Sequence, residues 1–296
     1  MASRPKLRRP LLVAAFRGWN DGAQGASLAG GYLAKTWSAA RFAEIDPETF
    51  FDFQATRPQV SLVDGVTRRI EWPDNGFYHA RLVAADRDVV LLLGIEPNVR
   101  WRTFTDLIVS LATELGVELV VSLGALLADV PHTRPSPVSG SATDPKLVEE
   151  LGLQLSRYEG PTGIVGVLHD ACRRAGIPSV SLWAAVPHYV SLAPSPRAAL
   201  ALCERLATLL SIDVDTSELA EAADAYERQV TEAVATDEET SAYVEELERR
   251  SELIEAEENL PSGDTIAAEL ARFLRERERG NGGPDAEREG PAEPAD

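Results

Sequence analysis

Short runs of apolar residues alternate with longer segments of helical periodicity through roughly the first two hundred residues of the chain. Four of these runs hold few polar residues, and they lie at 11–16, 89–94, 117–123 and 180–185. Runs of this length are typical of strands that are buried on both faces of a sheet. Parallel strands need crossover connections, so the alternation predicts an α/β fold in which helices wrap a mostly parallel, mixed sheet.

Weaker patterns complete the expected layout of this α/β domain. Strands of the edge type are expected at 42–45, 50–53, 68–72 and 78–83, and helices at 23–37, 101–115, 145–152 and 163–175. Asp144 and Ser195 each precede a proline and can cap a helix that starts there. The helix after Pro196 carries an apolar stripe and is expected to close the domain near Ile212.

The charge of the chain is concentrated in its last third. Residues 1–212 hold 21 basic and 21 acidic side chains, whereas residues 213–296 hold 8 basic and 26 acidic ones, which accounts for the net charge of -18. A balance of this kind argues against nucleic-acid binding, which needs basic surface. Two readings stay open for the acidic segment: solvated helix faces with a solubilising tail, or a docking site for a basic partner.

Three domains are expected from this change of pattern: an α/β domain at 1–212, an acidic helical extension at 213–279 and a disordered tail at 280–296. Capping pairs are expected at Asp215 with Glu218 and at Thr236 with Glu239. Narrow apolar stripes predict three helices in the extension, the last of them around 266–273. Gly, Pro and acidic residues without apolar anchors predict disorder in the tail.

The composition also indicates a compartment. An apolar fraction of 44% supports a sizeable core, and no apolar window is long enough to span a membrane. The basic start of the chain is followed by only six apolar residues, which does not fit a signal peptide. Cys172 and Cys203 have neither metal-site nor disulfide spacing, so a reducing, cytoplasmic location is expected.

Familiar catalytic, metal and cofactor motifs are missing from the sequence. It contains no His-Glu-x-x-His, no Cys-x-x-Cys and no Gly-x-Ser-x-Gly. Residues 30–36 superficially resemble a phosphate-binding loop, but Ala34 stands where glycine is required and Lys35 falls inside a predicted helix. No cofactor and no metal are therefore expected.

Polar residues gather where the predicted buried strands end. Ligands of parallel α/β sheets bind beyond the carboxyl ends of the strands, so these residues are expected to ring one cleft. The candidates are Arg17, Trp19, Asn20, Asp21, Glu96, Trp101, His132, Arg134, Thr162 and His188. Structural explanations stay open: helix capping for Asn20 or Asp21, a core position for His188, and anchoring of the proline-rich loop for His132 or Arg134.

The same segments carry a resemblance to a known family. Gly18-Trp19-Asn20-Asp21-Gly22, Gly94-Ile95-Glu96-Pro97 and the longer blocks at 124–135, 160–164 and 181–189 resemble the proteasome assembly chaperone 2 (PAC2) family in its actinobacterial branch. The resemblance covers roughly residues 11–212, and the acidic helical extension is also similar to the actinobacterial form. The blocks at 124–135 and 181–189 are long enough to be specific.

The resemblance implies a fold similar to nucleoside phosphorylases and self-association as a trimer or another small homo-oligomer. Eukaryotic relatives hold proteasome subunits during assembly without catalysing a reaction. No catalytic residues are carried over from the family.

Two hypotheses for function follow. The first is a non-enzymatic, homo-oligomeric protein that binds other proteins and assists assembly. The alternative is a small-molecule-binding protein, or a hydrolase-like or phosphorylase-like enzyme, that uses the strand-end cleft. In the alternative, Asp21, Glu96, His132 and His188 are the candidate acid–base groups, and Arg17 or Arg134 would hold an anion.

Overall fold

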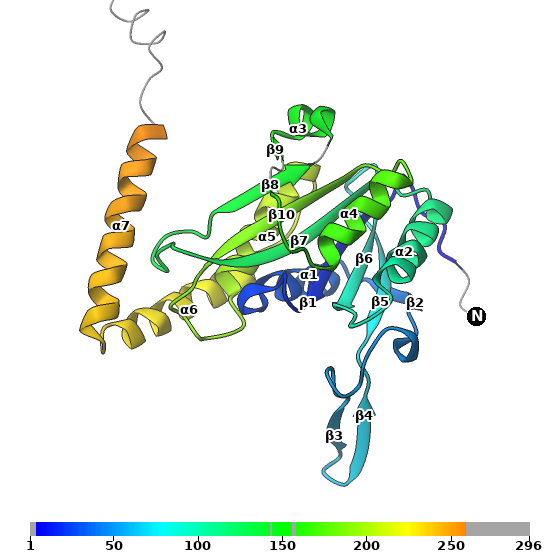
Figure 1. Ribbon diagram of the computed structural model, residues 1–296, viewed down its shortest axis with the longest axis horizontal. Helices are drawn as coiled ribbons and strands as arrows, with labels where there is room; N and C mark the ends of the chain where they lie inside the picture. The colour runs from blue at the N-terminus through cyan, green and yellow to red at the C-terminus, as the bar shows by residue number, and fades with distance from the viewer. Residues whose placement is uncertain (1–3, 143, 156–157, 259–296) are drawn as a thin grey trace, which may run out of the picture. The chain divides into compact units, whose positions relative to one another are not determined.

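The computed structural model describes residues 4–142, 144–155 and 158–258 (Figure 1). By its internal contacts the chain divides into two compact units, residues 1–248 and 249–296. The first unit contains an eight-stranded sheet in the order β2-β5-β6-β1-β7-β10-β8-β9. The strands of this sheet are β1 (Leu11–Arg17), β2 (Ala40–Glu44), β5 (Asn75–Arg81), β6 (Asp88–Ile95), β7 (Leu119–Ala128), β8 (Val138–Ala142), β9 (Gln154–Leu155) and β10 (Ser179–Pro187).

The four predicted buried strands form the centre of this sheet. β6, β1, β7 and β10 run parallel to one another, and the antiparallel pairings lie outside them, at β2–β5, β5–β6 and β10–β8. The predicted class, a mostly parallel mixed sheet flanked by helices, is confirmed. The likeness to nucleoside phosphorylases stays a prediction.

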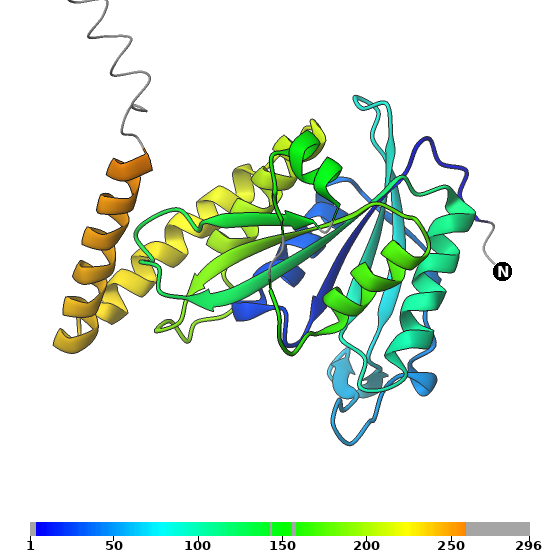
Figure 2. The ribbon, with the colours of Figure 1, turned by 45° about the horizontal axis from the view of Figure 1, so that its top comes forward.

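Helices cover both faces of the sheet (Figure 2). Successive side chains of a strand point to opposite faces, so Leu11 and Val13 of β1 join one apolar core and Leu12 and Ala14 join the other. The first core is closed by α1 and α5, and the second by α2 and α4. The helices are α1 (Gly25–Thr36), α2 (Trp101–Leu115), α3 (Pro145–Leu151), α4 (Ile164–Arg174), α5 (Pro196–Leu210), α6 (Ser217–Val234) and α7 (Glu238–Glu258), with short 3-10 turns at Gly22–Gln24 and Pro47–Thr49.

Several helix boundaries follow the predicted capping chemistry. The Asp144 carboxylate accepts from the Lys146 N–H at the start of α3, and the Ser195 hydroxyl accepts from the Ala198 N–H at the start of α5. The expected reciprocal caps of the extension are not formed. Asp215 accepts from Ser217, while Glu218 pairs with Lys35. In the second case Asp237, rather than Thr236, accepts from the Glu239 N–H.

Four segments differ from the predicted strands. Residues 50–53 are not a strand: Phe50 and Phe51 follow a 3-10 turn, which Asp46 caps, and fill the core below α2. The short strands β8 and β9 were not predicted because their sequences hold few large apolar residues. β7 continues to Ala128, five residues beyond the predicted end, because β10 pairs with it up to Pro187.

A separate two-stranded sheet was predicted only in part. β3 (Gln59–Val63) pairs with β4 (Thr67–Glu71), and the second of these corresponds to the predicted strand at 68–72. The turn between them places Asp64 and Gly65 at positive φ, which is the conformation of a tight hairpin turn. The Asp-Gly pair is a sequence signal that indicates this hairpin.

The helical segment at 213–248 belongs to the first unit and packs within it through its apolar stripe. Leu219, Ala223, Tyr226 and Val230 of α6 are buried, and α6 contacts α5. Val244 and Leu247 of α7 are buried as well. The predicted helix at 266–273 and the predicted disordered tail lie outside the described residues. Among the described residues no helix is both long and apolar enough to cross a membrane.

Candidate functional site

The loop after β1 is held to α4 by the carboxylate of Glu96, which follows β6. Oε2 of Glu96 accepts from the Trp19 N–H at 3.3 Å, and Oε1 accepts from the Ile164 N–H at 2.8 Å. Gly18 makes this approach possible, because it adopts φ +141° and a Cβ there would lie 2.9 Å from Cβ of Glu96. Glu96, which follows the carboxyl end of β6, thus ties the loop after β1 to the first turn of α4.

Asn20 and Asp21 are buried beside this loop. Oδ1 of Asp21 accepts from the backbone N–H groups of Ala26 and Ser27, at 2.8 and 3.2 Å, so the carboxylate caps the first turn of α1. Burial raises the pKa of Asp21. Nδ2 of Asn20 and Oδ2 of Asp21 have no hydrogen-bond partner among the described residues. Helix capping, one of the two readings of this pair, therefore explains one oxygen of Asp21 and leaves the other buried without a partner among the described residues.

A cleft of about 900 Å³ opens against these two residues. Its walls come from the loop after β1, from β7, β8 and β10, and from α4 together with the loop before it. Trp183 also lines the cleft. Its ring packs against Gly124, where a Cβ atom would lie only 2.4 Å from the ring. Four of the ten candidates line the cleft: Trp19, Asn20, Asp21 and Thr162.

One wall of the cleft carries a histidine that was not among the candidates. Nε2 of His169 lies 2.7 Å from Oγ of Ser122, and Nδ1 lies 2.9 Å from Oγ of Ser179. Burial lowers the pKa of His169 to about 4, so the imidazole is neutral at pH 7. Nearby, the hydroxyls of Ser141 and Ser181 are 2.9 Å apart. The serines inside the apolar strand runs were the signal for this polar wall, because a buried hydroxyl needs a partner.

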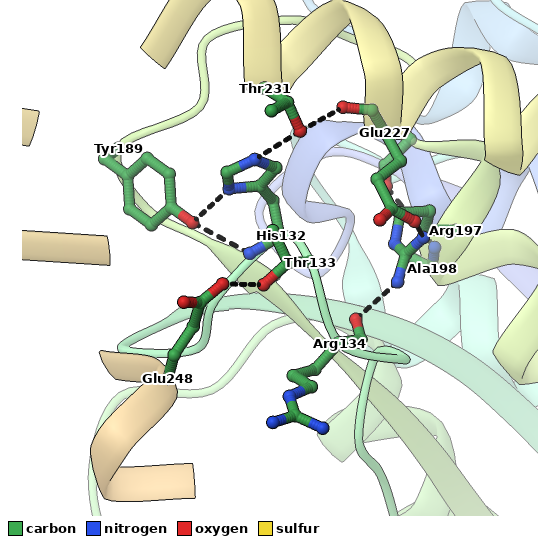
Figure 3. Close-up of polar contacts among 10 residues, drawn as sticks. His132, Thr133, Arg134, Tyr189, Arg197, Ala198, Glu227, Thr231 and Glu248 are labelled. Atoms are coloured by element: carbon green, nitrogen blue, oxygen red, sulfur yellow. Dashed lines mark hydrogen bonds and ion pairs between the residues drawn. The ribbon is translucent and has the colours of Figure 1, made fainter. Parts of the chain in front are cut away.

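His132 lies elsewhere, under α6 (Figure 3). The hydroxyl of Tyr189 accepts from the His132 N–H and lies 2.8 Å from Nδ1. Nε2 lies 3.1 Å from Oγ1 of Thr231. The tyrosine hydroxyl can donate to Nδ1, which leaves the ring hydrogen on Nε2 facing Thr231. Burial lowers the pKa of His132 and raises that of Tyr189 to about 12, so both groups are neutral at pH 7.

The neighbours of His132 are tied down by acidic residues of the helical segment (Figure 3). Thr133 donates to Glu248 of α7, and Arg197 of α5 pairs with Glu227 of α6. Arg197 also donates to the backbone oxygen of Arg134 at 2.6 Å. We call the set His132, Thr133, Tyr189, Arg197, Glu227, Thr231 and Glu248 the His132 cluster.

His188 lies at the exposed edge of this cluster. Its Nδ1 is 3.5 Å from Oδ1 of Asp129, which also accepts from the hydroxyl of Tyr243 at 3.2 Å. The rings of His188, Tyr189 and Tyr243 meet edge to face, with centroids 5.5 to 5.9 Å apart. His188 is exposed, so the explanation of this residue as a core histidine is wrong.

The remaining two candidates lie outside both the cleft and the His132 cluster. Trp101 is the first residue of α2 and packs against the core that α2 and α4 close. Its ring N–H donates to the backbone oxygen of Pro97 at 2.6 Å. Arg17 is exposed and faces a separate pocket of about 350 Å³ beside α1.

The structure therefore does not bring the ten candidates into one cleft. β7 pairs with β1 as far as Leu123. Beyond that residue β7 continues to Ala128. Five more residues at about 3.3 Å each move the loop at 131–135 roughly 15 Å along the strand direction. The His132 cluster therefore forms beyond the end of β7, whereas the cleft is lined by residues of β7 itself.

Comparison with known proteins places the chain in a family. A sequence model of the PAC2 family matches residues 15–234. The chain belongs to the PAC2 family. None of the curated proteins matches it.

Solved structures of actinobacterial proteins agree with this PAC2 assignment. A PAC2 family protein from Streptomyces avermitilis is 49% identical, with a TM-score of 0.74. A proteasome-assembly chaperone homologue from Mycobacterium tuberculosis is 50% identical, with a TM-score of 0.72. Each match covers 79% of this chain and 99% of the other. The resemblance that the sequence blocks indicated is confirmed.

A more distant structure shares the PAC2 fold. An archaeal proteasome activator from Pyrococcus furiosus is 18% identical, with a TM-score of 0.63, and the match covers 78% of this chain and 96% of that one. In the part of this PAC2 chain that the structure describes, no group of three or more His, Cys, Asp or Glu side chains is placed to hold a metal ion.

Proposed function

We propose that this PAC2 protein is a non-enzymatic homo-oligomer that binds other proteins and assists the assembly of a proteasome-type complex. The observation that carries the proposal is the apolar face of the β3–β4 hairpin. Val60 pairs with Ile70 and Leu62 with Arg68, so these four side chains share one face. Val60, Leu62 and Ile70 are each more than half exposed. Apolar surface of this kind is typical of protein contact sites.

The use of the acid–base groups supports a non-enzymatic role. Glu96 accepts two backbone N–H groups, and one oxygen of Asp21 accepts two more. His132 is fixed by hydroxyl groups on both ring nitrogens. Groups engaged in this way hold chain segments together, whereas a general acid or base must face a substrate. The description of the Mycobacterium tuberculosis relative as a proteasome-assembly chaperone homologue supports the same proposal.

Light scattering on the purified full chain tests self-association. We expect a mass of a trimer or another small oligomer, and a lower mass for the triple variant Val60→Thr, Leu62→Thr, Ile70→Thr, because threonine keeps the strand and removes the apolar face. Val83→Thr changes a side chain that is 93% exposed outside the hairpin and serves as the control. A monomeric wild-type protein contradicts the proposal, and an unchanged mass for the triple variant contradicts the assigned surface.

An assembly assay tests the partner. α-type and β-type proteasome subunits from the same organism are mixed with and without the full chain, and particle formation is followed on native gels. We expect faster formation of particles with the chain present and a smaller effect with the hairpin triple variant. An identical time course with and without the chain contradicts an assembly role.

The alternative, a hydrolase-like or phosphorylase-like enzyme in the cleft, is tested by thermal shift. Nucleosides, inorganic phosphate and sugar phosphates are the ligands to screen. A ligand at a hundredfold above its dissociation constant adds about 2.7 kcal/mol of stability. A shift with phosphate or a sugar phosphate favours the alternative.

A further inference from the structure

The apolar face of the β3–β4 hairpin lies open to solvent. The hairpin forms a two-stranded sheet that is separate from the eight-stranded one (Figure 1). Val60, Leu62 and Ile70 share this face and are each more than half exposed. Covering them with another apolar surface is favourable, because both surfaces leave water together.

The fourth side chain of this face is Arg68, which restricts the surface that can cover it. Arg68 stands opposite Leu62 and has no ion-pair partner among the described residues. Glu71, the one acid within the two strands, lies on the opposite face. Two hairpins packed face to face would therefore bring two arginines together without a carboxylate, which is unfavourable. The face fits an apolar surface that carries a carboxylate.

A groove of about 560 Å³ in the first unit offers such a surface. It lies between the loop after β10 and the C-terminal part of α6, and we call it the α6 groove. Its apolar lining consists of Val190, Leu192, Ala193, Val230, Ala233 and Val234. The described residues that line it include none from the hairpin, so the hairpin of the same chain does not fill it.

The lining of the α6 groove also includes a carboxylate, that of Asp237. Hydrogen bonds from the Thr240 hydroxyl and the Glu239 N–H lower the pKa of Asp237, so the carboxylate is charged at pH 7. Glu238 and Glu239 follow it in the chain, and none of the three acids has an ion-pair partner in the part of the chain that the structure describes. An apolar groove with a carboxylate thus complements an apolar face with an arginine.

We propose that the hairpin of one subunit docks into the α6 groove of a second copy of this chain, with Arg68 facing Asp237. This inference rests on the proposed self-association and specifies the surface that receives the hairpin. Because hairpin and groove are different surfaces, the contact is head to tail: each subunit gives its hairpin to one neighbour and its groove to the next. Contacts of this kind close into rings when the rotation between subunits returns to the first copy.

A substitution in the groove tests the docking by light scattering on the full chain. Ala233 is exposed on α6, so Ala233→Arg fills the groove and repels Arg68, while arginine keeps the helix. We expect the mass to fall to that of a monomer. Ala222→Arg makes the same change at an exposed position of α6 outside the groove lining, and we expect it to keep the mass of the wild type.

Mixing two variants separates head-to-tail docking from hairpin–hairpin packing. The triple variant Val60→Thr, Leu62→Thr, Ile70→Thr keeps its groove, and Ala233→Arg keeps its hairpin. We expect each to be monomeric alone and an equimolar mixture to form a dimer, because one intact hairpin then meets one intact groove. This dimer also shows that both variants are folded. Hairpin–hairpin packing instead leaves Ala233→Arg associated on its own.

A double-mutant cycle on the mixed dimer tests the pairing of Arg68 with Asp237. Arg68→Gln is added to the Ala233→Arg chain, and Asp237→Asn is added to the triple variant, where asparagine can still cap α7. We expect each change to raise Kd about fivefold, and both together to raise it no further than one alone. Arg69→Gln removes the same charge from the opposite face of the hairpin and is expected to leave Kd unchanged.

Three results overturn this inference alone: a wild-type mass for Ala233→Arg, a mixture without the dimer, or additive effects of Arg68→Gln and Asp237→Asn. In each of these cases the wild-type chain is still an oligomer that the triple variant disrupts, so the proposed self-association stands and the hairpin packs in another way. A monomeric wild-type chain overturns both.

Discussion

The cleft after β1 and the His132 cluster both begin where parallel strands of one sheet end. In the cleft, Trp19 and Tyr158 are exposed, and polar atoms of Asn20 and Asp21 stay unpaired among the described residues. In the His132 cluster, both ring nitrogens of the histidine have hydroxyl partners. The same kind of sequence signal, polar residues after a buried strand, has thus produced an open site and a closed one.

The difference comes from what covers each strand end. α6 and α7 supply Thr231, Glu227 and Glu248 to the His132 cluster. The described residues of these helices supply no lining to the cleft. Part of the acidic excess of the chain is therefore used in contacts with its own body. A polar strand end becomes a site for other molecules only where no later segment of the chain satisfies it.

The test with the largest expected effect on stability removes the ion pair between Arg197 and Glu227 of α6. The side chain of Arg197 is 13% exposed, and it pairs with Glu227 and donates to the backbone oxygen of Arg134. Arg197→Ala leaves a partly buried carboxylate and a carbonyl without their donor. We expect the free energy of unfolding to fall by about 3 kcal/mol, measured by urea denaturation.

Arg173→Ala at the cleft is the matched control. The Arg173–Asp170 pair is more than half exposed on both sides, so its loss should change the free energy of unfolding by less than about 0.5 kcal/mol. Equal effects of the two substitutions would show that α6 does not seal the cluster.

A second test compares by pH the buried His132 and the partly buried His169. Burial lowers the folded-state pKa of His169 to about 4, below the ordinary value of 6.5, so the unfolded chain takes up a proton first. Stability from this group is complete above pH 6.5 and is lost as the pH falls toward 4. From pH 7 to pH 5 the loss is about 2 kcal/mol. Burial also lowers the pKa of His132, which adds a loss in the same direction.

Urea denaturation at several pH values, on His169→Gln and on His132→Gln, separates the two contributions. We expect a flatter dependence on pH in each variant. The change should be larger for His169→Gln, because its pKa has the larger shift. A dependence unchanged from the wild type in His169→Gln would mean that this imidazole is not held neutral by its surroundings.

The centre of the fold was predictable because buried parallel strands leave a direct pattern in sequence. The run at 11–16 became β1, and the helix expected at 101–115 became α2 with the same bounds. β8 left no such pattern, because its sequence Val-Ser-Gly-Ser-Ala is mostly small residues, and Gly140 among them packs against Leu153 and Leu182. Its place beside β10 is decided by tertiary contacts.

The candidate site was predictable only to the level of which segments leave the sheet. The loop after β1 and Glu96 meet, as expected from neighbouring strand ends. The place of His132 depended on how far β7 extends past Leu123, and that length follows from pairing with β10. The partners Thr231 and Glu248 lie 99 and 115 residues away from their hydrogen-bonded partners in the chain, so no local pattern indicates them.

The smallest test compares two tyrosine hydroxyls, one in each region. The hydroxyl of Tyr189 serves both the backbone N–H and Nδ1 of His132, and burial raises its pKa to about 12. Tyr189→Phe leaves those two groups unpaired, and we expect a loss of about 1 kcal/mol in the free energy of unfolding. The exposed hydroxyl of Tyr158 donates to the backbone oxygen of Pro161 in a loop that water reaches, so Tyr158→Phe should cost less than about 0.5 kcal/mol. A larger loss from Tyr158→Phe than from Tyr189→Phe, in the same urea series, would reverse the assignment of closed and open strand ends, because water can replace a hydrogen bond only where it has access.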